Sequence, residues 1–393
     1  MYDKMGSKMK VLILADPASP HTIKWVNSLL RKNIEILLFG LTGYKPDNYS
    51  KSQNLTIHSL RLDGKVFAKP DGDPSKINYL KAIPVIRKII REFKPDILHA
   101  HYASSYGLLG ALSRFHPFIL SVYGADVYSF PRKNIFTKKL FKFNLSAADK
   151  ILSTSNIMAK EIKKYTKKQI EVTPFGVDLN IFHPSVREEN LFGKNDIVVG
   201  TVKSLEDKYG IEFLIKAFNL VKDRYPELPL KLLIVGKGTK EGELKKLVVE
   251  LGISDVTTFT GFVDYDKVHK YHNMIDIAVF VSTEDSESFG VSVLEASACA
   301  KPVIVSDAGG LPEVVEKDIT GLIVEKKNIA QTADAIEVLL LNNELRLRLG
   351  ENGRERVGEK YNLEDNIAQM VGIYNRCYAA LGKMEEWDSG GME

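Results

Sequence analysis

The stretch Glu287-Ser-Phe-Gly-Val-Ser-Val-Leu-Glu295, with the apolar run Ile277-Ala-Val-Phe-Val281 before it, decides the fold. The run predicts a buried strand, and a helix is expected to begin near Phe289-Gly290 after a short polar loop. Glu287 precedes that helix, and Glu295 lies about two turns inside it at roughly 3.6 residues per turn. Glu295 therefore lies among apolar neighbours, where an ionised acid is costly unless donors satisfy it. A vicinal diol, such as the ribose of a nucleotide, supplies two donors.

Backbone amides at the start of this helix are the second part of the signal. The N–H groups of Phe289, Gly290 and Val291 are expected to point at an anion above the helix start. An acid that accepts from hydroxyls, next to amides that attract an anion, suits a nucleotide-linked sugar.

Short apolar runs alternate with helical patterns along the chain, which predicts parallel sheets with crossover helices. The expected strands are Val11–Ala15, Ile34–Phe39, Thr56–Leu60, Ile97–Ala100, Phe118–Val122, Lys150–Thr154 and Glu171–Thr173, then Ile197–Thr201, Leu230–Val235, Val256–Thr260, Ile277–Val281, Pro302–Val305 and Gly321–Val324. The polar segment Ser185–Asn195 between the two series lacks periodicity and predicts the domain junction. We expect two doubly wound α/β domains facing a central cleft, with ligands at the carboxyl ends of the strands.

The composition fits two globular domains in a reducing compartment. With 393 residues, 44% of them hydrophobic, the chain is long enough for two cores. No apolar run reaches the roughly 18 residues of a membrane helix, and no signal-peptide pattern is present. The two cysteines, Cys299 and Cys377, lack metal-ligand spacing, so we expect a cytoplasmic protein.

Positive charge is concentrated in the first half of the chain. Residues 1–185 hold 29 Lys+Arg and 14 Asp+Glu, a balance of +15, whereas the remainder holds 25 and 36, a balance of −11. The asymmetry indicates a partner that is anionic on one side only. An anionic membrane surface, a phosphorylated lipid carrier and an acidic glycan all fit.

The loop after the first strand of the second series supplies cations for a pyrophosphate. Lys203 follows the strand directly, with Ser204 beside it, and Lys208 precedes a helix start at Ile211. A lysine at a helix start is unfavourable unless an anion offsets it. Two solvated loop lysines are the alternative. Beside the two acids, we favour the phosphate-binding interpretation.

Three glycine-containing turns follow other strands of this series. Gly236-Lys-Gly238 and Gly309-Gly310-Leu-Pro-Glu313 each precede a helix, and Gly261-Phe-Val263 offers backbone groups to a nucleobase. Each alone is typical of a tight turn or of helix capping. Their shared position at strand ends favours contact with the donor.

In the first domain, Tyr123-Gly-Ala-Asp126 follows the strand Phe118–Val122. Asp126 is a candidate that binds sugar hydroxyls or orients a neighbour, and a helix N-cap is the equally good alternative. His99 and His101 flank a strand end, where one is expected to be a buried structural histidine. His21, in the loop after the first strand, is expected to line an acceptor site with His101.

Two further segments are considered as a metal site and as a membrane contact. Asp71-Gly-Asp73 resembles an acid-x-acid metal clamp, but it lies between prolines with no strand before it, so we predict a turn and no metal. Residues 130–143 interleave lysines and an arginine with phenylalanines and an isoleucine. That pattern suits contact with an anionic membrane, and an ordinary helix with a solvated face is the even alternative.

These motifs together resemble the retaining glycosyltransferases of family 4, and the resemblance covers nearly the whole chain. The motifs that carry it are Pro174-Phe-Gly-Val-Asp178, Lys208-x-Gly210, Gly236-x-Gly238, the pair Glu287 and Glu295, and Ala308-Gly-Gly-Leu-Pro-Glu313. The resemblance implies the GT-B fold, with two Rossmann-like domains. It implies an acceptor-binding domain at 1–184, a nucleotide-sugar domain at 185–362, a helix at 363–382 that crosses back to the first domain, and a tail at 383–393.

By the same resemblance, Glu287 holds the donor sugar near the reacting centre and Glu295 holds the ribose. Lys203 and Lys208, with the amides of Phe289 and Gly290, stabilise the departing diphosphate without a metal or other cofactor. Retention then proceeds by front-side attack, with the leaving phosphate taking the acceptor's proton.

Three departures from the family pattern concern the substrates. Tyr123 stands where histidine is common beside the donor sugar, and Lys203 stands where arginine is usual, so a bidentate fork is lost. Asp16-Pro-Ala-Ser-Pro20 replaces a glycine-rich loop, so acceptor recognition is expected to differ.

The sequence thus predicts a retaining, metal-independent glycosyltransferase that serves surface glycan, capsule or glycolipid assembly at the inner membrane face. A UDP-sugar is favoured over a GDP-sugar as donor, the acceptor is a glycan or a lipid-linked molecule, and nucleic acid is not expected as a partner. The alternatives are a sugar-nucleotide 2-epimerase of the same fold, and a non-catalytic nucleotide- or glycan-binding partner of another transferase.

Overall fold

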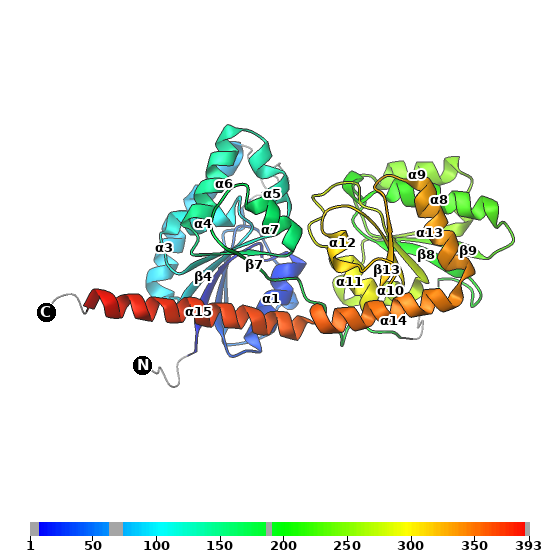
Figure 1. Ribbon diagram of the computed structural model, residues 1–393. Helices are drawn as coiled ribbons and strands as arrows, with labels where there is room; N and C mark the ends of the chain where they lie inside the picture. The colour runs from blue at the N-terminus through cyan, green and yellow to red at the C-terminus, as the bar shows by residue number, and fades with distance from the viewer. Residues whose placement is uncertain (1–7, 63–73, 186–190, 390–393) are drawn as a thin grey trace. The chain divides into compact units, whose positions relative to one another are not determined.

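The structure is a computed structural model that describes residues 8–62, 74–185 and 191–389. The chain forms two compact units (Figure 1). Unit 1 contains residues 1–173 and 364–393, and unit 2 contains residues 174–363. Among the described residues, no helix is both long and apolar enough to cross a membrane.

Unit 1 is built on a parallel sheet of seven strands in the order β3-β2-β1-β4-β5-β6-β7. The strands are β1 Lys10–Leu14, β2 Glu35–Gly40, β3 Leu55–Ser59, β4 Ile97–His101, β5 Phe118–Val122, β6 Lys150–Ser153 and β7 Ile170–Val172. The helices are α1 Pro20–Leu30, α3 Ala82–Phe93, α4 Tyr106–Ser113, α5 Ala125–Tyr128, α6 Ile135–Ala147, α7 Asn156–Ile162 and α15 Leu363–Ser389, with short 3₁₀ turns η1 Pro46–Asn48, η2 Pro74–Lys81 and η3 Phe130–Arg132.

Unit 2 repeats this plan with six parallel strands in the order β10-β9-β8-β11-β12-β13. The strands are β8 Ile197–Val202, β9 Leu230–Val235, β10 Thr257–Gly261, β11 Ile277–Phe280, β12 Val303–Ser306 and β13 Gly321–Val324. The helices are α8 Ile211–Arg224, α9 Glu241–Glu250, α10 Val268–Met274, α11 Val291–Ala298, α12 Leu311–Val314, α13 Ile329–Leu341 and α14 Asn343–Lys360, with η4 Asp207–Tyr209, η5 Ser254–Val256 and η6 Tyr265–Lys267.

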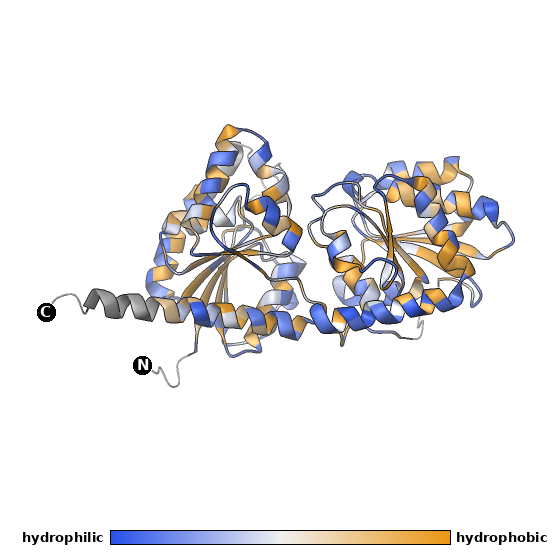
Figure 2. Cartoon of the chain, viewed as in Figure 1, coloured by the Kyte–Doolittle hydropathy of each residue, from blue (hydrophilic) through white to orange (hydrophobic). Residues whose placement is uncertain are grey.

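Each sheet is the hydrophobic centre of its unit (Figure 2). Strands such as β4, β5, β11 and β12 are buried along their whole length, as parallel strands covered by helices on both faces must be. Each predicted strand overlaps a strand of the described residues, although β3, β7 and β10 are less buried than the central strands. The two α/β sheets confirm the predicted fold class.

The structure draws the boundary between the units earlier than the predicted junction after residue 184. Residues 174–185 belong to unit 2 because Val177 pairs with Asn362 and the Phe175 ring packs on Phe289 at 6.0 Å. At the other end, the last helix continues to Ser389, past the predicted end at 382. This helix packs on unit 1, where the Gln369 side chain donates to the carbonyl of Val172 at 2.9 Å.

Candidate active site

Lys203 and Glu287 meet because the strands that carry them are neighbours in the unit 2 sheet. β8 and β11 pair in parallel, and the strand order changes direction at this pair. Lys203 follows β8 directly, and Glu287 lies in the loop between β11 and α11. Ligands of open α/β sheets bind outside the carboxyl ends of the strands at such a switch point.

Lys203 and Glu287 form an ion pair. The Lys203 Nζ lies 2.7 Å from Glu287 Oε2, and the two side chains are only 14% and 10% exposed. Burial is the largest single effect and would lower the pKa of Lys203. The charge of Glu287 and its hydrogen bond, together with Tyr209 and Glu295, outweigh burial and raise that pKa above its ordinary value. Lys203 is therefore charged at neutral pH. The sequence pointed to a free cation and missed this pairing.

Tyr209 brings the second lysine to the same place. The ammonium of Lys203 lies 4.4 Å from the centre of the Tyr209 ring, and that of Lys208 lies 4.8 Å from it. Cations are attracted to the face of an aromatic ring, so one tyrosine holds both. Tyr209 was not identified from the sequence, although its place next to Lys208 was the available signal.

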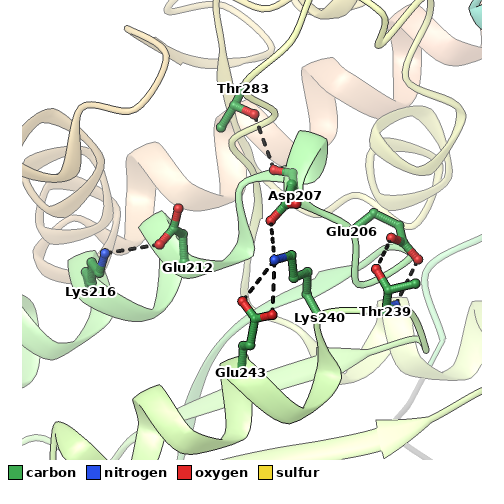
Figure 3. Close-up of polar contacts among 8 residues, drawn as sticks. All are labelled: Glu206, Asp207, Glu212, Lys216, Thr239, Lys240, Glu243 and Thr283. Carbon is green, nitrogen blue, oxygen red and sulfur yellow. Dashed lines mark hydrogen bonds and ion pairs between the residues drawn. The ribbon is translucent and has the colours of Figure 1, made fainter.

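The loop of residues 203–210, called here the lysine loop, is fixed by its neighbours (Figure 3). Glu206 accepts a hydrogen bond from the Thr239 backbone N–H at 2.9 Å, and Asp207 pairs with the Lys240 ammonium at 3.2 Å. On the other side, the Thr283 N–H donates to the Lys208 carbonyl at 2.8 Å. These contacts position the backbone of the loop that carries both lysines.

Two glycines let neighbouring loops pack against these residues. Gly236 has a φ of +138°, and a Cβ there would lie 2.0 Å from the carbonyl oxygen of Lys203. Gly309 has a φ of +49°, and a Cβ there would lie 2.1 Å from the carbonyl oxygen of Glu287. The Gly236 N–H donates to the Gly261 carbonyl at 3.0 Å, so Gly236 serves the site through close packing.

The start of α11 offers free backbone donors beside the ion pair. Within the described part of the chain, the N–H groups of Phe289, Gly290 and Val291 have no hydrogen-bond partner. Gly290, with a φ of +97°, is the N-cap. The Ser292 hydroxyl donates to the Val202 carbonyl at 2.6 Å, which ties this helix start to the end of β8.

Glu295 is buried in α11 and held from the segment that follows β10. The Tyr265 hydroxyl donates to Glu295 Oε1 at 3.0 Å, and the ring of His272 lies 3.6 Å from Oε2. Neither residue was identified from the sequence. Their spacing, with His269 between them at i, i+4 and i+7, is a helical pattern that could have revealed a shared face.

The other two predicted donor contacts lie at strand ends of the same sheet. Ser204 is exposed directly after Lys203. Val263 follows β10, which is separated from β8 by β9, and its exposed neighbour Phe262 is 73% accessible.

In unit 1, Asp126 organises two loops. Its carboxylate is fully buried and accepts from three backbone N–H groups, those of Ala103 at 2.7 Å, Gly124 at 2.8 Å and Tyr123 at 3.1 Å. The N-cap of α5 is Gly124, so the capping alternative does not hold. Three backbone donors use most of the acceptor capacity of this carboxylate, which supports the orienting role over direct binding of sugar hydroxyls.

A chain of aromatic rings fills the switch point of unit 1, where β1 and β4 are neighbours. Ring centroids are 4.6 Å apart for His99 and His101, 5.4 Å for His101 and Tyr123, and 6.4 Å for Tyr123 and His21. Burial, and then the nearby His21, lower the pKa of His101 to about 3. His99, whose pKa burial also lowers, and His101 are therefore neutral at pH 7.

His99 is the structural histidine of the pair. Its ring nitrogens lie 2.7 Å from the Tyr374 hydroxyl and 2.8 Å from the Ser121 hydroxyl. His101 Nδ1, in contrast, is buried without a hydrogen-bond partner among the described residues.

The predicted turn at Asp71 and Asp73 lies outside the described residues.

Comparison with known proteins gives a match on each unit. Residues 183–356 match the family described as "Glycosyl transferases group 1", and residues 10–155 match "Glycosyl transferase 4-like". An uncharacterized glycosyltransferase of Methanocaldococcus jannaschii is 28% identical over 87% of this chain and 90% of its own length. A GDP-mannose-dependent phosphatidylinositol monomannoside mannosyltransferase of Mycobacterium tuberculosis is 32% identical, and the match spans about half of each chain (51% and 54%).

Solved structures share the fold. Sucrose-phosphate synthase of Thermosynechococcus elongatus matches with a TM-score of 0.80 at 22% identity, over 95% of this chain and all of its own. HepE of Anabaena, solved in complex with UDP, matches with a TM-score of 0.75 at 17% identity, over 94% and 100%. The matched segments on both units, together with the two-sheet GT-B fold, support a glycosyltransferase of the family 4 type.

Proposed function

We propose that the chain transfers a sugar from a nucleoside diphosphate to an acceptor hydroxyl, with retention of configuration and without a metal ion. The observation that carries this proposal is the group formed by Lys203, Glu287, Lys208 and Tyr209 beside the open amides of α11. A leaving diphosphate needs fixed positive charge where its own negative charge develops. Two ammonium groups on one ring, next to a helix start, supply it.

The proposed reaction forms one bond and breaks one. The acceptor oxygen bonds to the anomeric carbon while the bond from that carbon to the diphosphate oxygen breaks, and the acceptor's proton passes to the departing phosphate. Glu287 holds the sugar's hydroxyls, and the ion pair with Lys203 keeps its carboxylate in place. Glu295 receives the ribose.

UDP-sugars are the donors that we favour over GDP-sugars. HepE, which shares the fold, was solved with UDP and with UDP-glucose. The mycobacterial relative named above is GDP-mannose-dependent, so both bases belong in the test. We assign the acceptor side to the rings of His21 and His101 in unit 1, where hydroxyls rather than phosphates would be bound.

Donor turnover tests this proposal. Release of nucleoside diphosphate from UDP-, GDP- and ADP-sugars is measured in EDTA for the wild type, for Glu287→Ala, and for Glu284→Ala as an exposed control three residues away. We expect one donor class to be turned over in chelator, with a loss of about 10²–10³-fold for Glu287→Ala only. Turnover that requires added manganese, or that survives in Glu287→Ala, would overturn the proposal.

We also propose that α6 contacts an anionic membrane surface at the inner face, where a lipid-linked acceptor would be met. Its outer face exposes Ile135 (69%), Phe136 (70%) and Phe143 (44%). Exposed lysines lie on the same face, at positions 138, 139 and 142. Apolar side chains flanked by lysines are typical of helices that lie in the membrane interface.

Vesicle binding tests this contact. The wild type is expected to bind anionic vesicles in low salt and to be released as salt rises, while a variant with Ser at 138, 139 and 142 binds less. Equal binding to neutral vesicles, or none to either, would contradict it.

A further inference from the structure

The carboxylate of Glu295 is held by groups outside its own helix. Tyr265 belongs to η6 and His272 to α10, and both follow β10 in the chain. We propose that Tyr265 and His272 are positioning residues, which orient the Glu295 carboxylate to receive the two ribose hydroxyls of the nucleotide. This inference rests on the proposed function and deepens it.

Tyr265 supplies a lasting hydrogen-bond donor. Its hydroxyl lies 3.0 Å from Glu295 Oε1. Burial, and then the charge of Glu295, raise the pKa of Tyr265 well above its ordinary value, so the hydroxyl keeps its proton at any physiological pH. The carboxylate oxygen Oε1 is thus fixed from one side.

His272 supplies the second contact. Its side chain is fully buried, and its Nε2 lies 3.6 Å from Glu295 Oε2, slightly beyond hydrogen-bond length. Neither ring nitrogen has a hydrogen-bond partner among the described residues. An imidazole carries at least one N–H in either protonation state, and leaving a buried donor unsatisfied is costly. Oε2 of Glu295 is the acceptor that the structure places within reach.

Phe182 holds both rings in these orientations. It is fully buried, and its ring centroid lies 5.8 Å from that of Tyr265 and 6.0 Å from that of His272. The Arg354 guanidinium donates to the Phe182 carbonyl at 3.3 Å, which fixes the backbone at this position. The two residues that contact Glu295 therefore share one buried aromatic neighbour.

The acceptor capacity of a carboxylate matches this arrangement. An ionised carboxyl group has two oxygens with about four lone-pair positions. Tyr265 takes one position on Oε1, and His272 faces Oε2, so each oxygen keeps capacity for one more donor. A cis-diol presents two donors to two adjacent oxygens. A binding group whose orientation is fixed in advance loses less entropy when the ligand arrives.

Simple core packing around Phe182 is the competing explanation, and it predicts a different result. If Tyr265 and His272 only stabilise the fold, their loss weakens every nucleotide equally. If they act through Glu295, their loss weakens recognition of the ribose hydroxyls specifically. A comparison of a nucleoside diphosphate with its 2′-deoxy analogue separates the two.

The experiment measures the Kd of UDP, GDP and ADP by calorimetry, and then of the 2′-deoxy form of whichever binds. The wild type is expected to prefer the ribose form by about ten- to a hundredfold, the range for hydrogen bonds to a charged group. In Tyr265→Phe and His272→Leu this preference should fall to about threefold or less. His272→Gln, which keeps an N–H donor, should retain most of it, and Tyr271→Phe on the same helix should retain all of it.

The outcomes distinguish this inference from the function on which it rests. If none of the three diphosphates binds the wild type, the proposed function fails. If one binds but the ribose preference is absent, or persists unchanged in both Tyr265→Phe and His272→Leu, the positioning role is refuted. Tyr265→Phe removes only one hydroxyl, and its side chain is 36% exposed, so this variant is expected to fold. It therefore tests the positioning role even if His272→Leu does not fold.

Discussion

The two units place opposite chemistries at the same point of the same topology. In unit 2 the switch point between β8 and β11 carries an ammonium–carboxylate pair and a second lysine on a shared ring. In unit 1 the switch point between β1 and β4 carries a row of neutral histidine and tyrosine rings. A fold can therefore fix where a ligand binds while the loop residues decide what charge the ligand has.

This difference assigns the substrates in our proposal. Unit 2 has fixed positive charge, which suits the diphosphate of the donor. Uncharged rings with a buried, unpartnered His101 nitrogen suit the hydroxyls of an acceptor, and unit 1 has them. Variants that remove charge from unit 2 should thus act differently from variants that alter unit 1.

Lys203→Met should have the largest effect on stability, because it leaves the buried carboxylate of Glu287 without its partner. We expect a loss of about 3 kcal/mol in the free energy of unfolding, measured by denaturant titration. The folded pKa of Lys203 is raised, so its contribution is present below its unfolded pKa and is lost as pH rises through the folded value. The difference in unfolding free energy between wild type and variant should therefore be constant from about pH 6 to 9 and should become smaller above about pH 10.5. A difference in unfolding free energy that stays constant into the alkaline range would show that the Lys203–Glu287 ion pair does not stabilise unit 2.

Lys208→Ala should have the next largest effect, on turnover. Loss of one cation beside the leaving diphosphate is expected to lower kcat/KM about a hundredfold. Lys216→Ala, in the exposed pair with Glu212, is the matched control and should change kcat/KM by less than about twofold. Similar losses in both variants would mean that overall charge, rather than position, is responsible.

His101→Gln should alter the acid stability of unit 1. The folded pKa of His101 is about 3, below its ordinary value, so the unfolded chain binds a proton that the folded one rejects. Wild-type stability should therefore fall as pH drops below about 6.5, and the variant should lose about 2 kcal/mol less between pH 7 and 5. Parallel stability curves for the two proteins would contradict a neutral, buried His101.

Asp126→Asn should have the smallest effect of the four. The amide keeps one acceptor oxygen but turns an NH₂ group toward a backbone donor, which should cost about 1–2 kcal/mol of unfolding free energy. A drop in turnover of more than about tenfold with unchanged stability would show instead that Asp126 acts on the substrate.

Apolar runs such as Ile277–Phe280 predicted the sheets, because a parallel strand that is buried on both faces consists mainly of apolar residues. Lys203 and Glu287 were each identified, since a charged residue after a buried strand is visible in the sequence. The ion pair between them was not predicted, because it depends on which strands become neighbours in the sheet. The two residues are far apart in the chain. The same reason hid the contact of Tyr265 with Glu295.

Asp126 illustrates a second limit of sequence reasoning. A carboxylate after a strand fits capping, sugar binding and loop organisation equally well. Only the positions of the Ala103 and Gly124 amides, brought together by β4 and β5, show which donors it accepts from.

Hydrogen exchange with and without a nucleoside diphosphate, in the presence of EDTA, tests the central claim most directly. The diphosphate identified in the binding panel should slow amide exchange in residues 203–209 and 287–294 of unit 2. Residues 99–126 of unit 1 should exchange unchanged. Slowed exchange in unit 1 instead, or slowing in unit 2 only after manganese is added, would contradict a metal-free cationic site at the β8–β11 switch point.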